Sequence, residues 1–422
     1  HLKMKSGRNW GRLGMKSNCE TIKAEDFCFT VTDGTHDSPK AKEDGYYLIT
    51  SKHLAPYNID FSSAKRISDE DYQQVIKRSP VEQWDILFSM IGTIGITYLE
   101  KNTNIDYACK NMGIFKFNGD KDKAYWLYYY LQTPQAKEYI LGHLRGTTQQ
   151  YLPLGSLRDF PIQVPSTKIR NNITSILRSL DDRIAVNIAI NENLEQQAQA
   201  IFKSWFVDFE PFGGVMPEDM REVPLNELCE IVTKGTTPTT IGKHFSDKGI
   251  NFLKAESILQ NHSFDRNKFA HIDNDTHKVL KRSIIKEGDI VFTIAGTLGR
   301  FALVDNTIIP ANTNQAVAII RANKNVISSE YLYSFFIGNW HNEYYAKRVQ
   351  QAVQANLSLA TIKSLPIFVL SNKDMMRYND LVTPICKAMK ANEYENLCLS
   401  ALRDTLLPKL MNGEIDVSKV KI

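Results

Sequence analysis

The sequence predicts an α+β protein in which two similar globular domains with curved β-sheets alternate with two long helices that pair as an antiparallel coiled coil. Three observations predict this architecture: an internal repeat of about two hundred residues, a heptad-like seam towards the end of each repeat, and short β-rich runs elsewhere. A chain of 422 residues also exceeds what one hydrophobic core usually serves. We therefore expect a pseudo-twofold internal repeat of one structural unit.

The repeat is clearest at one eleven-residue segment. The segment Asp85-Ile-Leu-Phe-Ser-Met-Ile-Gly-Thr-Ile-Gly95 returns 204 residues later as Asp289-Ile-Val-Phe-Thr-Ile-Ala-Gly-Thr-Leu-Gly299. Flanking matches keep the same order, because residues 31–35 match 232–236 and residues 152–162 match 357–367. Residues 57–80 have no evident counterpart in 257–282. The shared segments therefore indicate framework, and the divergent ones indicate variable surface.

Each repeat ends in a long predicted helix. Residues 166–207 contain neither glycine nor proline. Spacing of three and four residues predicts a coiled-coil seam along this helix, made of Leu177, Leu180, Ile184, Asn187, Asn191, Leu194, Ala198, Ile201 and Trp205. The second repeat has the same spacing at Leu381, Ile385, Ala388, Asn392, Glu395, Leu399, Leu402 and Leu406. Offsets of 201 and 204 residues both align the two seams.

A helix with such a seam needs a partner, and the other repeat supplies the obvious one. Polar seam residues such as Asn191 and Asn392 fix register at a cost in stability. Pro384 is expected to kink the second helix or to start its main part, and Gly413 to end it. The alternative, in which each helix packs only on its own domain, stays open.

We expect the domains at residues 1–165 and 209–371, with helical regions at 166–208 and 372–422. Residues 85–95 and 290–299 have the character of a buried strand followed by a Gly-Thr-x-Gly turn. No GxxxxGK[ST] pattern accompanies that turn, so it is not interpreted as a phosphate-binding loop. Residues 125–141 and 330–348 are predicted to be helical.

Loops at corresponding places in the two domains combine cations with amide and hydroxyl side chains. Such residues hold phosphates and read base edges, since Arg and Lys suit guanine whereas Gln and Asn suit adenine. The candidate DNA contacts of the first domain are Gly34, Thr35, His36, Lys52, Arg145, Thr147, Thr148, Gln149 and Gln150. Those of the second are Lys234, Thr236, Thr237, Lys254, Lys347, Arg348, Gln350 and Gln351. The alternative is that these loops only face solvent.

The sequence offers no catalytic or metal site. The six cysteines form no CxxC pair, and the scattered histidines lack metal-ligand spacing. There is no P-loop, no adenine methyltransferase motif and no acidic cluster at nuclease spacing. A net charge of +4 permits a polyanionic partner without requiring one. We expect a protein of the cytoplasm, because the sequence shows no signal peptide and no membrane span.

The segments that close the two repeats are the most distinctive ones. Residues 191–209 read Asn-Glu-Asn-Leu-Glu-Gln-Gln-Ala-Gln-Ala-Ile-Phe-Lys-Ser-Trp-Phe-Val-Asp-Phe, and residues 402–415 read Leu-Arg-Asp-Thr-Leu-Leu-Pro-Lys-Leu-Met-Asn-Gly-Glu-Ile. With these segments and its alternating plan, nearly the whole chain resembles the specificity subunit (HsdS) of type I restriction-modification enzymes. The chain departs from that family before Val31, where extra residues follow Trp10 to Leu13 and leave the position of the first strand open.

The resemblance implies a non-catalytic subunit whose two target recognition domains each read one half of a bipartite, asymmetric site on double-stranded DNA. It also implies that the helices set the gap and dock two modification subunits, which are joined by restriction and translocase subunits. S-adenosylmethionine, Mg²⁺ and ATP are then expected on those partners, and none in this chain. Two other interpretations remain: a coiled-coil scaffold with two protein-binding modules, and a self-contained nuclease or methyltransferase, which the missing motifs disfavour.

Overall fold

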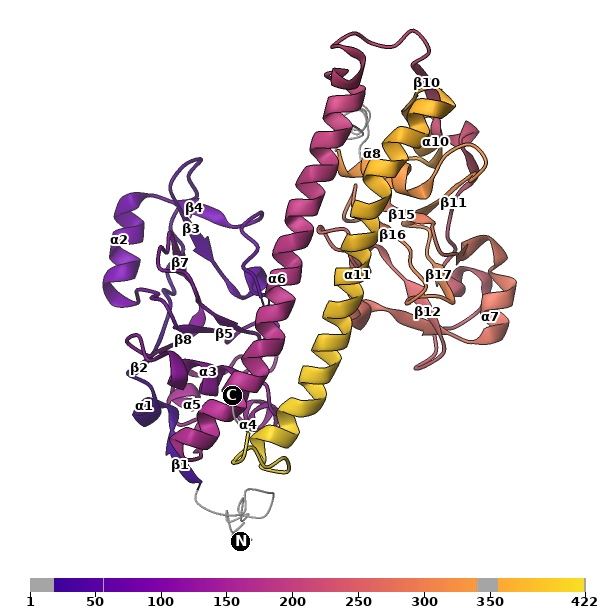
Figure 1. Cartoon of the computed structure of the whole chain (residues 1–422). Helices are drawn as coiled ribbons and strands as arrows, with labels where there is room; N and C mark the ends of the chain where they lie inside the picture. Colours follow the sequence, from indigo (N-terminus) through magenta and orange to yellow (C-terminus); the bar gives the residue numbers. More distant parts are fainter. Residues whose placement is uncertain (1–18, 56, 339, 341–355, 421–422) are drawn as a thin grey trace. The chain divides into compact units, whose positions relative to one another are not determined.

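The computed structural model describes residues 19–55, 57–338, 340 and 356–420. The chain divides into two compact units. Unit 1 contains the described residues up to Ala185 together with those from Cys398 onward, and unit 2 is Val186–Leu397. This division passes through both long helices, α6 (Thr167–Phe206) and α11 (Asn372–Met411), so that each unit holds a segment of both (Figure 1). The four-part division at 165, 208 and 371 remains a prediction.

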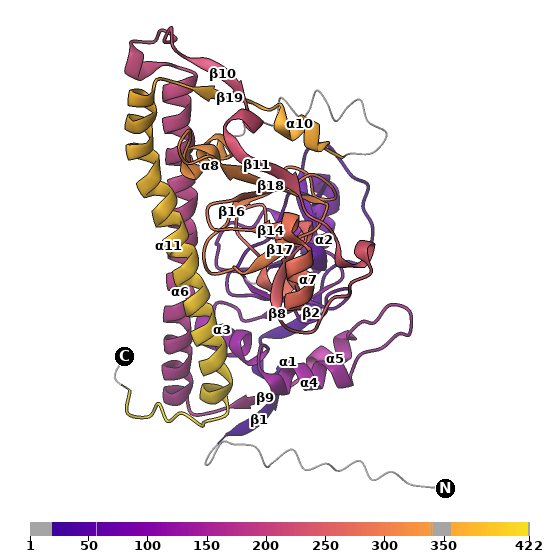
Figure 2. The same cartoon turned by 90° about the vertical axis from the view of Figure 1, so that its right-hand side faces the viewer.

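Unit 1 contains two main sheets, with strand orders β2-β8-β5-β6 and β4-β3-β7, and a β1-β9 ribbon. Its strands are β1 (Glu20–Lys23), β2 (Thr30–Asp33), β3 (Tyr46–Ile49), β4 (Lys65–Ile67), β5 (Ile86–Ser89), β6 (Thr97–Leu99), β7 (Tyr107–Cys109), β8 (Met112–Lys116) and β9 (Pro161–Val164). Its helices besides the long ones are α1 (Ala24–Phe27), η1 (Ser51–His53), α2 (Asp69–Arg78), α3 (Lys121–Tyr130), α4 (Pro134–Gly142) and α5 (Leu154–Arg158). Helix α2 lies on the side of the sheets away from α6 (Figures 1 and 2).

Unit 2 repeats this plan with sheets β11-β18-β15-β16 and β13-β12-β17-β14 and a β10-β19 ribbon. Its strands are β10 (Arg221–Pro224), β11 (Cys229–Lys234), β12 (Ile250–Leu253), β13 (Ala270–Ile272), β14 (Ile284–Ile285), β15 (Ile290–Thr293), β16 (Phe301–Leu303), β17 (Ala311–Thr313), β18 (Val317–Ala322) and β19 (Pro366–Val369). Its helices are α7 (Asn274–Val279), α8 (Ser329–Ile337) and α10 (Leu359–Lys363), with short 3-10 helices η2 (Glu210–Phe212), η3 (Leu225–Glu227), η4 (Pro238–Ile241), η5 (Ala255–Ser257), η6 (Arg266–Lys268) and η7 (Lys281–Ser283).

The repeated aspartate forms a buried ion pair in both units. In unit 1, Asp85 accepts from Lys116 Nζ at 2.8 Å. In unit 2, Asp289 accepts two bonds of 2.7 Å from Arg321. Burial raises the pKa of Asp85 and the bond from Lys116 opposes this shift, whereas the bond to Asp289 raises the pKa of Arg321. The same carboxylates also accept a hydrogen bond from the backbone N–H three residues earlier, at Glu82 and Lys286. The aspartate therefore fixes both the neighbouring strand and the turn that precedes its own strand.

The rest of the repeated segment is a buried strand with a fixed turn, as the sequence predicts. The four residues of β5 and of β15 are buried. The hydroxyl of Ser89 donates across the turn to Thr93 O and accepts from Ile96 N, and Thr293 makes the corresponding bonds in unit 2. Both glycines of each turn have positive φ, which glycine adopts without steric cost. The repeated sequence segment therefore forms a β-hairpin in each unit, β5 with β6 and β15 with β16.

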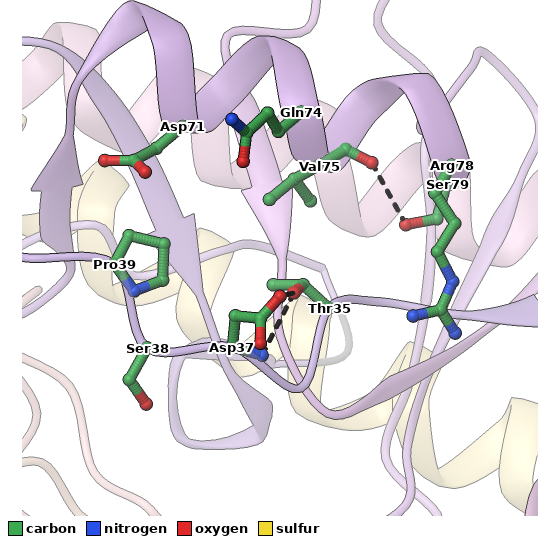
Figure 3. Close-up of a pocket in the computed structure, with 9 residues that line it drawn as sticks. All are labelled: Thr35, Asp37, Ser38, Pro39, Asp71, Gln74, Val75, Arg78 and Ser79. Atoms are coloured by element: carbon green, nitrogen blue, oxygen red, sulfur yellow. Dashed lines mark hydrogen bonds between the residues drawn. The ribbon is translucent and has the colours of Figure 1, made fainter.

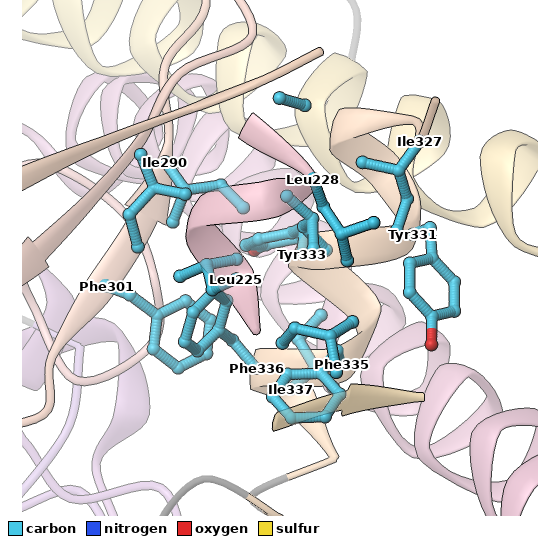
Figure 4. Close-up of a cluster of buried hydrophobic side chains, with 14 of the residues drawn as sticks. Leu225, Leu228, Ile290, Phe301, Ile327, Tyr331, Tyr333, Phe335, Phe336 and Ile337 are labelled. Carbon is cyan, nitrogen blue, oxygen red and sulfur yellow. The ribbon is translucent and has the colours of Figure 1, made fainter. Parts of the chain in front are cut away.

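Aromatic clusters fill the core between the sheets and the long helices. In unit 2, side chains of α8 such as Tyr331, Phe335 and Phe336 pack with Leu225, Ile290 and Phe301 (Figure 4). In unit 1, the equivalent cluster contains Trp126 and Tyr129 of α3. The helix predicted at 125–141 is two helices, because Pro134 begins α4 and disfavours helical geometry at Thr133. The prediction for 330–348 is confirmed as far as Ile337; residues 341–348 lie outside the described part.

The two long helices run antiparallel within each unit. In unit 2, the ring of Tyr378 on α11 lies 5.1 Å from Phe206 and 5.6 Å from Trp205 of α6. In unit 1, Ile173 and Leu177 share a core with Leu407, Leu410 and Met411. Of the predicted seam of α6, Leu177, Ile184, Asn187, Ala198 and Trp205 are buried, and Leu180, Asn191, Leu194 and Ile201 are partly buried. Packing of each helix only on its own domain is therefore wrong.

Two predicted seam positions of α11 are wrong. Leu381 and Leu402 are 46% and 47% exposed, and their neighbours Val382 and Arg403 face inward instead. The reason is that α11 packs against its domain as well as against α6, so its buried stripe is wider than a coiled-coil seam. Ile385, Ala388, Asn392, Glu395, Leu399 and Leu406 are partly buried, as predicted. Helix α11 continues through Pro384, which does not start it, and ends before Gly413, which has positive φ.

Asparagines set the register of the helix pair. In unit 2, Asn392 Nδ2 donates to Asn191 Oδ1 at 2.8 Å, and Asn187 Nδ2 donates to Asn396 Oδ1 at 2.9 Å. Both long helices have 40 residues, and their bounds differ by 205. Adding 205 to the residue numbers of α6 places Asn187 at the position of Asn392 and Asn191 at that of Asn396. The repeat therefore converts one of these two hydrogen bonds into the other. The helices therefore correspond at 205, and neither 201 nor 204 is correct for them.

A corresponding loop of each domain reaches the long helices. In unit 1, Asp181 of α6 accepts from the hydroxyls of Tyr57 and Tyr129, and Arg403 of α11 donates to it at 2.9 Å. Burial raises the pKa of Asp181 to about 6, and the bond from Tyr129 opposes this shift. In unit 2, the loop residue His262 stacks on Phe301 and lies 3.5 Å from Glu195 of α6. The contact is thus made by different chemistry in the two units.

A close backbone contact follows β2 and β11. Gly34 N donates to Met112 O and Thr35 N donates to Cys109 O, each at 2.9 Å. In unit 2, Gly235 N donates to Val317 O and Thr236 N donates to Thr313 O. A Cβ at either glycine would collide with the carbonyl oxygen at the end of β7 or of β17. These bonds join the two sheets of each unit.

No helix in the part of the chain that the structure describes is long and apolar enough to cross a bilayer.

We predict that Gly34→Ala and Gly235→Ala each lower the free energy of unfolding by more than about 1 kcal/mol, because the added methyl group displaces a hydrogen-bonded strand end. Gly155→Ala in α5 is the matched control, since open space surrounds it. That control should be neutral or slightly stabilising in a helix. Denaturant unfolding measures both; equal effects at Gly34 and Gly155 would contradict the steric explanation.

We predict that Asn191→Ala and Asn392→Ala are energetically coupled by roughly 0.5–1.5 kcal/mol in a double-mutant cycle, because the two side chains share one hydrogen bond. Asn325, an exposed residue of the turn before α8, supplies the control, since it takes no part in the hydrogen bonds of Asn191 and Asn392. Its substitution should add to that of Asn191 without coupling. Strict additivity of the Asn191 and Asn392 effects would show that the bond contributes nothing to register.

Candidate nucleic-acid interface

Several strands of unit 1 end at one edge. Strands β2 and β5 both lie antiparallel to β8, so their last residues, Asp33 and Ser89, lie beside the first residues of β8. Strand β3 runs parallel to β7, and Thr35 bridges to Lys110 just beyond β7. The loops that follow β2, β3, β5 and β7 therefore open at the same place. We call this the strand-end edge of unit 1.

Another loop extends this edge. Residues 145–151 are closed by two backbone bonds of 2.9 Å between Arg145 and Tyr151, and Tyr151 also bridges to Ile91 in the Gly-Thr-x-Gly turn. The candidate contacts Arg145, Thr147, Thr148, Gln149 and Gln150 are all exposed on this loop. Sequence segments more than a hundred residues apart are thus brought together, with polar side chains facing solvent.

Unit 2 has the same strand-end edge. Lys234 ends β11 and Thr293 ends β15, and both pair with the first residues of β18. Strand β12 runs parallel to β17 and ends opposite Thr313. Lys234 is exposed, and Thr236 and Thr237 are half-buried; Thr237 bonds to Gln315 in the β17–β18 turn. Lys347, Arg348, Gln350 and Gln351 lie outside the described residues.

The edge of unit 1 is organised around a buried carboxylate. Asp33 is 5% exposed and accepts from Arg78 Nη2 at 2.7 Å, while its other oxygen lies 2.9 Å from His36 Nε2. The second ring nitrogen of His36 lies 2.8 Å from Asn111 Oδ1. The imidazole of His36 is therefore held in place with its ring largely exposed.

Not every candidate contact has an exposed side chain. Thr35 is buried and its hydroxyl accepts from Asp37 N, so its role in this structure is to shape the loop. Gly34 serves the close backbone contact. Lys52 is exposed on η1 after β3. Lys254 is half-buried after β12, with its ammonium 5.3 Å from the ring centre of Phe245. Direct contact of any of these residues with DNA remains a prediction.

Sequence reasoning missed residues that the fold brings to the edge. These are Arg78, Lys110 and Asn111 in unit 1, and Arg282, Asn314 and Gln315 in unit 2. For the two arginines a sequence signal exists: an offset of 204 residues aligns the dipeptide Arg78-Ser79 with Arg282-Ser283, inside segments that otherwise differ. The idea that residues 57–80 have no counterpart is therefore wrong at this dipeptide. Within the described ranges, no three or more His, Cys, Asp or Glu side chains gather to hold a metal ion.

The chain is similar to proteins of one family. The family model for the type I restriction modification DNA specificity domain matches residues 38–196 and again residues 217–369. The MjaIX specificity subunit of a type I restriction enzyme from Methanocaldococcus jannaschii is 25% identical over 408 residues, covering 92% of each chain. The HindI specificity subunit from Haemophilus influenzae is 24% identical over 408 residues, covering 80% of this chain and 88% of its own.

The fold is also found in a solved structure. The S subunit of a type I restriction-modification system from M. genitalium matches with a TM-score of 0.51 at 16% identity, covering 95% of this chain and 96% of its own. The two matches of the family model together take up most of the chain. The first begins just after the loop that follows β2 and contains the other loops of the strand-end edge of unit 1, and the second contains β11 and the edge of unit 2. The chain therefore belongs to the type I restriction modification DNA specificity domain family.

Proposed function

We propose that this chain is the non-catalytic DNA-recognition subunit of a type I restriction-modification complex, and that the strand-end edge of each unit reads one half of a bipartite, asymmetric target. One observation carries the proposal: the two edges share their backbone hydrogen bonds but differ in side chains. A backbone frame that the two units share, with different polar side chains on it, suits direct readout, in which side chains at fixed positions distinguish base pairs.

The difference between the edges is one of charge. At the end of β2, unit 1 has Asp33 with Asp37 beyond it, whereas unit 2 has Lys234 at the matching position. Carboxylates accept from cytosine, and cations donate to guanine or hold phosphate. Asp33 itself is buried against Arg78 and His36, so the two edges present different polar groups to DNA at this position: a cation tied to a carboxylate in unit 1 and an exposed lysine in unit 2. We therefore expect the two half-sites to differ.

The long helices support a second part of the proposal, namely that they set the gap and dock two modification subunits. In unit 2, Val186 and Ile190 of α6 and Tyr394 and Leu397 of α11 are exposed apolar side chains. Such side chains favour a partner that covers them. Restriction and translocase subunits would complete the complex, with S-adenosylmethionine, Mg²⁺ and ATP bound by partners.

The test is to produce the chain together with its modification subunit and to map methylated adenines across a genome. The expected result is a bipartite motif that disappears when this chain is deleted. Methylation without such a motif, or a motif that persists after deletion, would contradict the proposal.

We predict that removing one heptad from both helices changes the gap and leaves the half-sites unchanged. Deleting 188–194 and 389–395 removes segments that lie opposite each other, because Asn191 pairs with Asn392. Seven residues correspond to about 10 Å of helix, or about three base pairs. Methylation mapping gives the new spacing. An unchanged gap in an active complex would refute a spacer role.

A further inference from the structure

The arginines that end the divergent segments occupy matching positions. Arg78 and Arg282 are exposed, and the serines after them are buried. Arg78 Nη2 donates to Asp33 Oδ1 at 2.7 Å, and Arg282 Nη2 donates to Thr236 Oγ1 at 3.0 Å. Arg78 therefore reaches the last residue of β2, and Arg282 reaches the loop just after β11, although the segments before the two arginines differ in sequence.

The charges around the two arginines differ. Arg78 shares the buried carboxylate of Asp33 with His36, so that its charge is compensated and its direction is fixed. Arg282 bonds to a neutral hydroxyl, and the position of Asp33 is taken by the exposed Lys234. Unit 2 thus presents two cations where unit 1 presents a cation held by an anion.

Space for a ligand lies beside Arg78. A cavity of about 370 Å³ separates the loop 35–39 from the face of α2 that carries Gln74 and Arg78 (Figure 3). Its other polar lining includes Thr35, Asp37 and Asp71. Arg78 has a side-chain exposure of 57%, so donors not used by Asp33 remain accessible.

We propose that Arg78 and Arg282 are corresponding DNA contacts in the two half-sites, and that Arg78 reads a base edge whereas Arg282 with Lys234 holds a phosphate. The inference rests on the proposed function. A guanidinium group held in one orientation can donate two parallel hydrogen bonds to the O6 and N7 acceptors of guanine. Such a contact depends on the orientation of the group more than on its charge. Among the residues that the structure describes, no carboxylate pairs with Arg282 or Lys234, and two such cations attract phosphate whatever the base sequence.

The test uses the full chain in complex with its modification subunits and a duplex that carries the motif found by methylation mapping. Arg78→Lys and Arg282→Lys keep the charge and remove the fork. Arg282→Ala removes the charge, with Lys281→Ala as its matched control one residue away. Lys77→Ala is the corresponding control in unit 1. Binding is measured as a function of salt concentration, with the motif and with single base-pair changes.

Arg78→Lys should lower discrimination at one base pair of one half-site by about tenfold. Lys77→Ala should leave that discrimination unchanged. Arg282→Lys should bind as the native complex does. Arg282→Ala should weaken binding to all duplexes and reduce the slope of log K against log salt by about 0.9, the loss of one phosphate contact.

Two results would overturn the inference: an unchanged motif with Arg78→Lys, or Arg282→Ala behaving as Lys281→Ala does. Thermal unfolding of each variant identifies a folding defect. If Arg78→Lys has a lower melting temperature than the native chain, the double variant Asp33→Asn/Arg78→Ala is used instead, because it removes both charges of the pair. Base-pair discrimination by that double variant then tests whether Arg78 reads a base. A native complex that yields no bipartite motif refutes the proposed function itself, whereas a motif insensitive to both arginines refutes only this inference.

Discussion

The strand-end edge of each unit depends on one close backbone contact. Gly34 lies against the carbonyl of Cys109, and Gly235 lies against that of Thr313. This contact joins the end of a strand in one sheet to the end of a strand in the other, so loops from both sheets open together. Because only backbone atoms and a missing side chain are involved, the surrounding side chains are free to vary. The two units can therefore keep one geometry and carry different recognition chemistry.

A buried ion pair lies at the opposite end of the same strands. Asp85 with Lys116, and Asp289 with Arg321, tie the start of one strand to the end of its neighbour. A buried pair is weak support for stability, because desolvation offsets attraction, but a mispaired strand would leave a charge buried alone. The pair therefore favours one register of β5 against β8 and of β15 against β18. That register decides which residues stand at the edge.

The long helices use a comparable device. Their apolar stripes would tolerate a slip of one turn, since apolar contacts have little direction. The hydrogen bonds Asn187–Asn396 and Asn191–Asn392 are lost in any other register. Each domain then binds its helix segments through its own loop, by Tyr57 with Asp181 in unit 1 and by His262 with Glu195 in unit 2. The asparagine bonds between the long helices are thus common to the two repeats, whereas the contact between each domain loop and its helix uses different residues in each unit.

The sequence by itself determined the features that depend on neighbours along the chain. The buried strand and glycine turn at 85–95, the bounds of α6 and the repeat of the whole plan all follow from local periodicity, turn residues and self-similarity. The tertiary structure alone decided which asparagines of the two long helices pair, the inward position of Val382 and Arg403 in place of Leu381 and Leu402, and the arrival of Arg78 and Lys110 at the edge. The physical reason is that a shift of three residues is nearly one helical turn, and that strand order and two-sided helix packing are set by contacts between segments far apart in sequence.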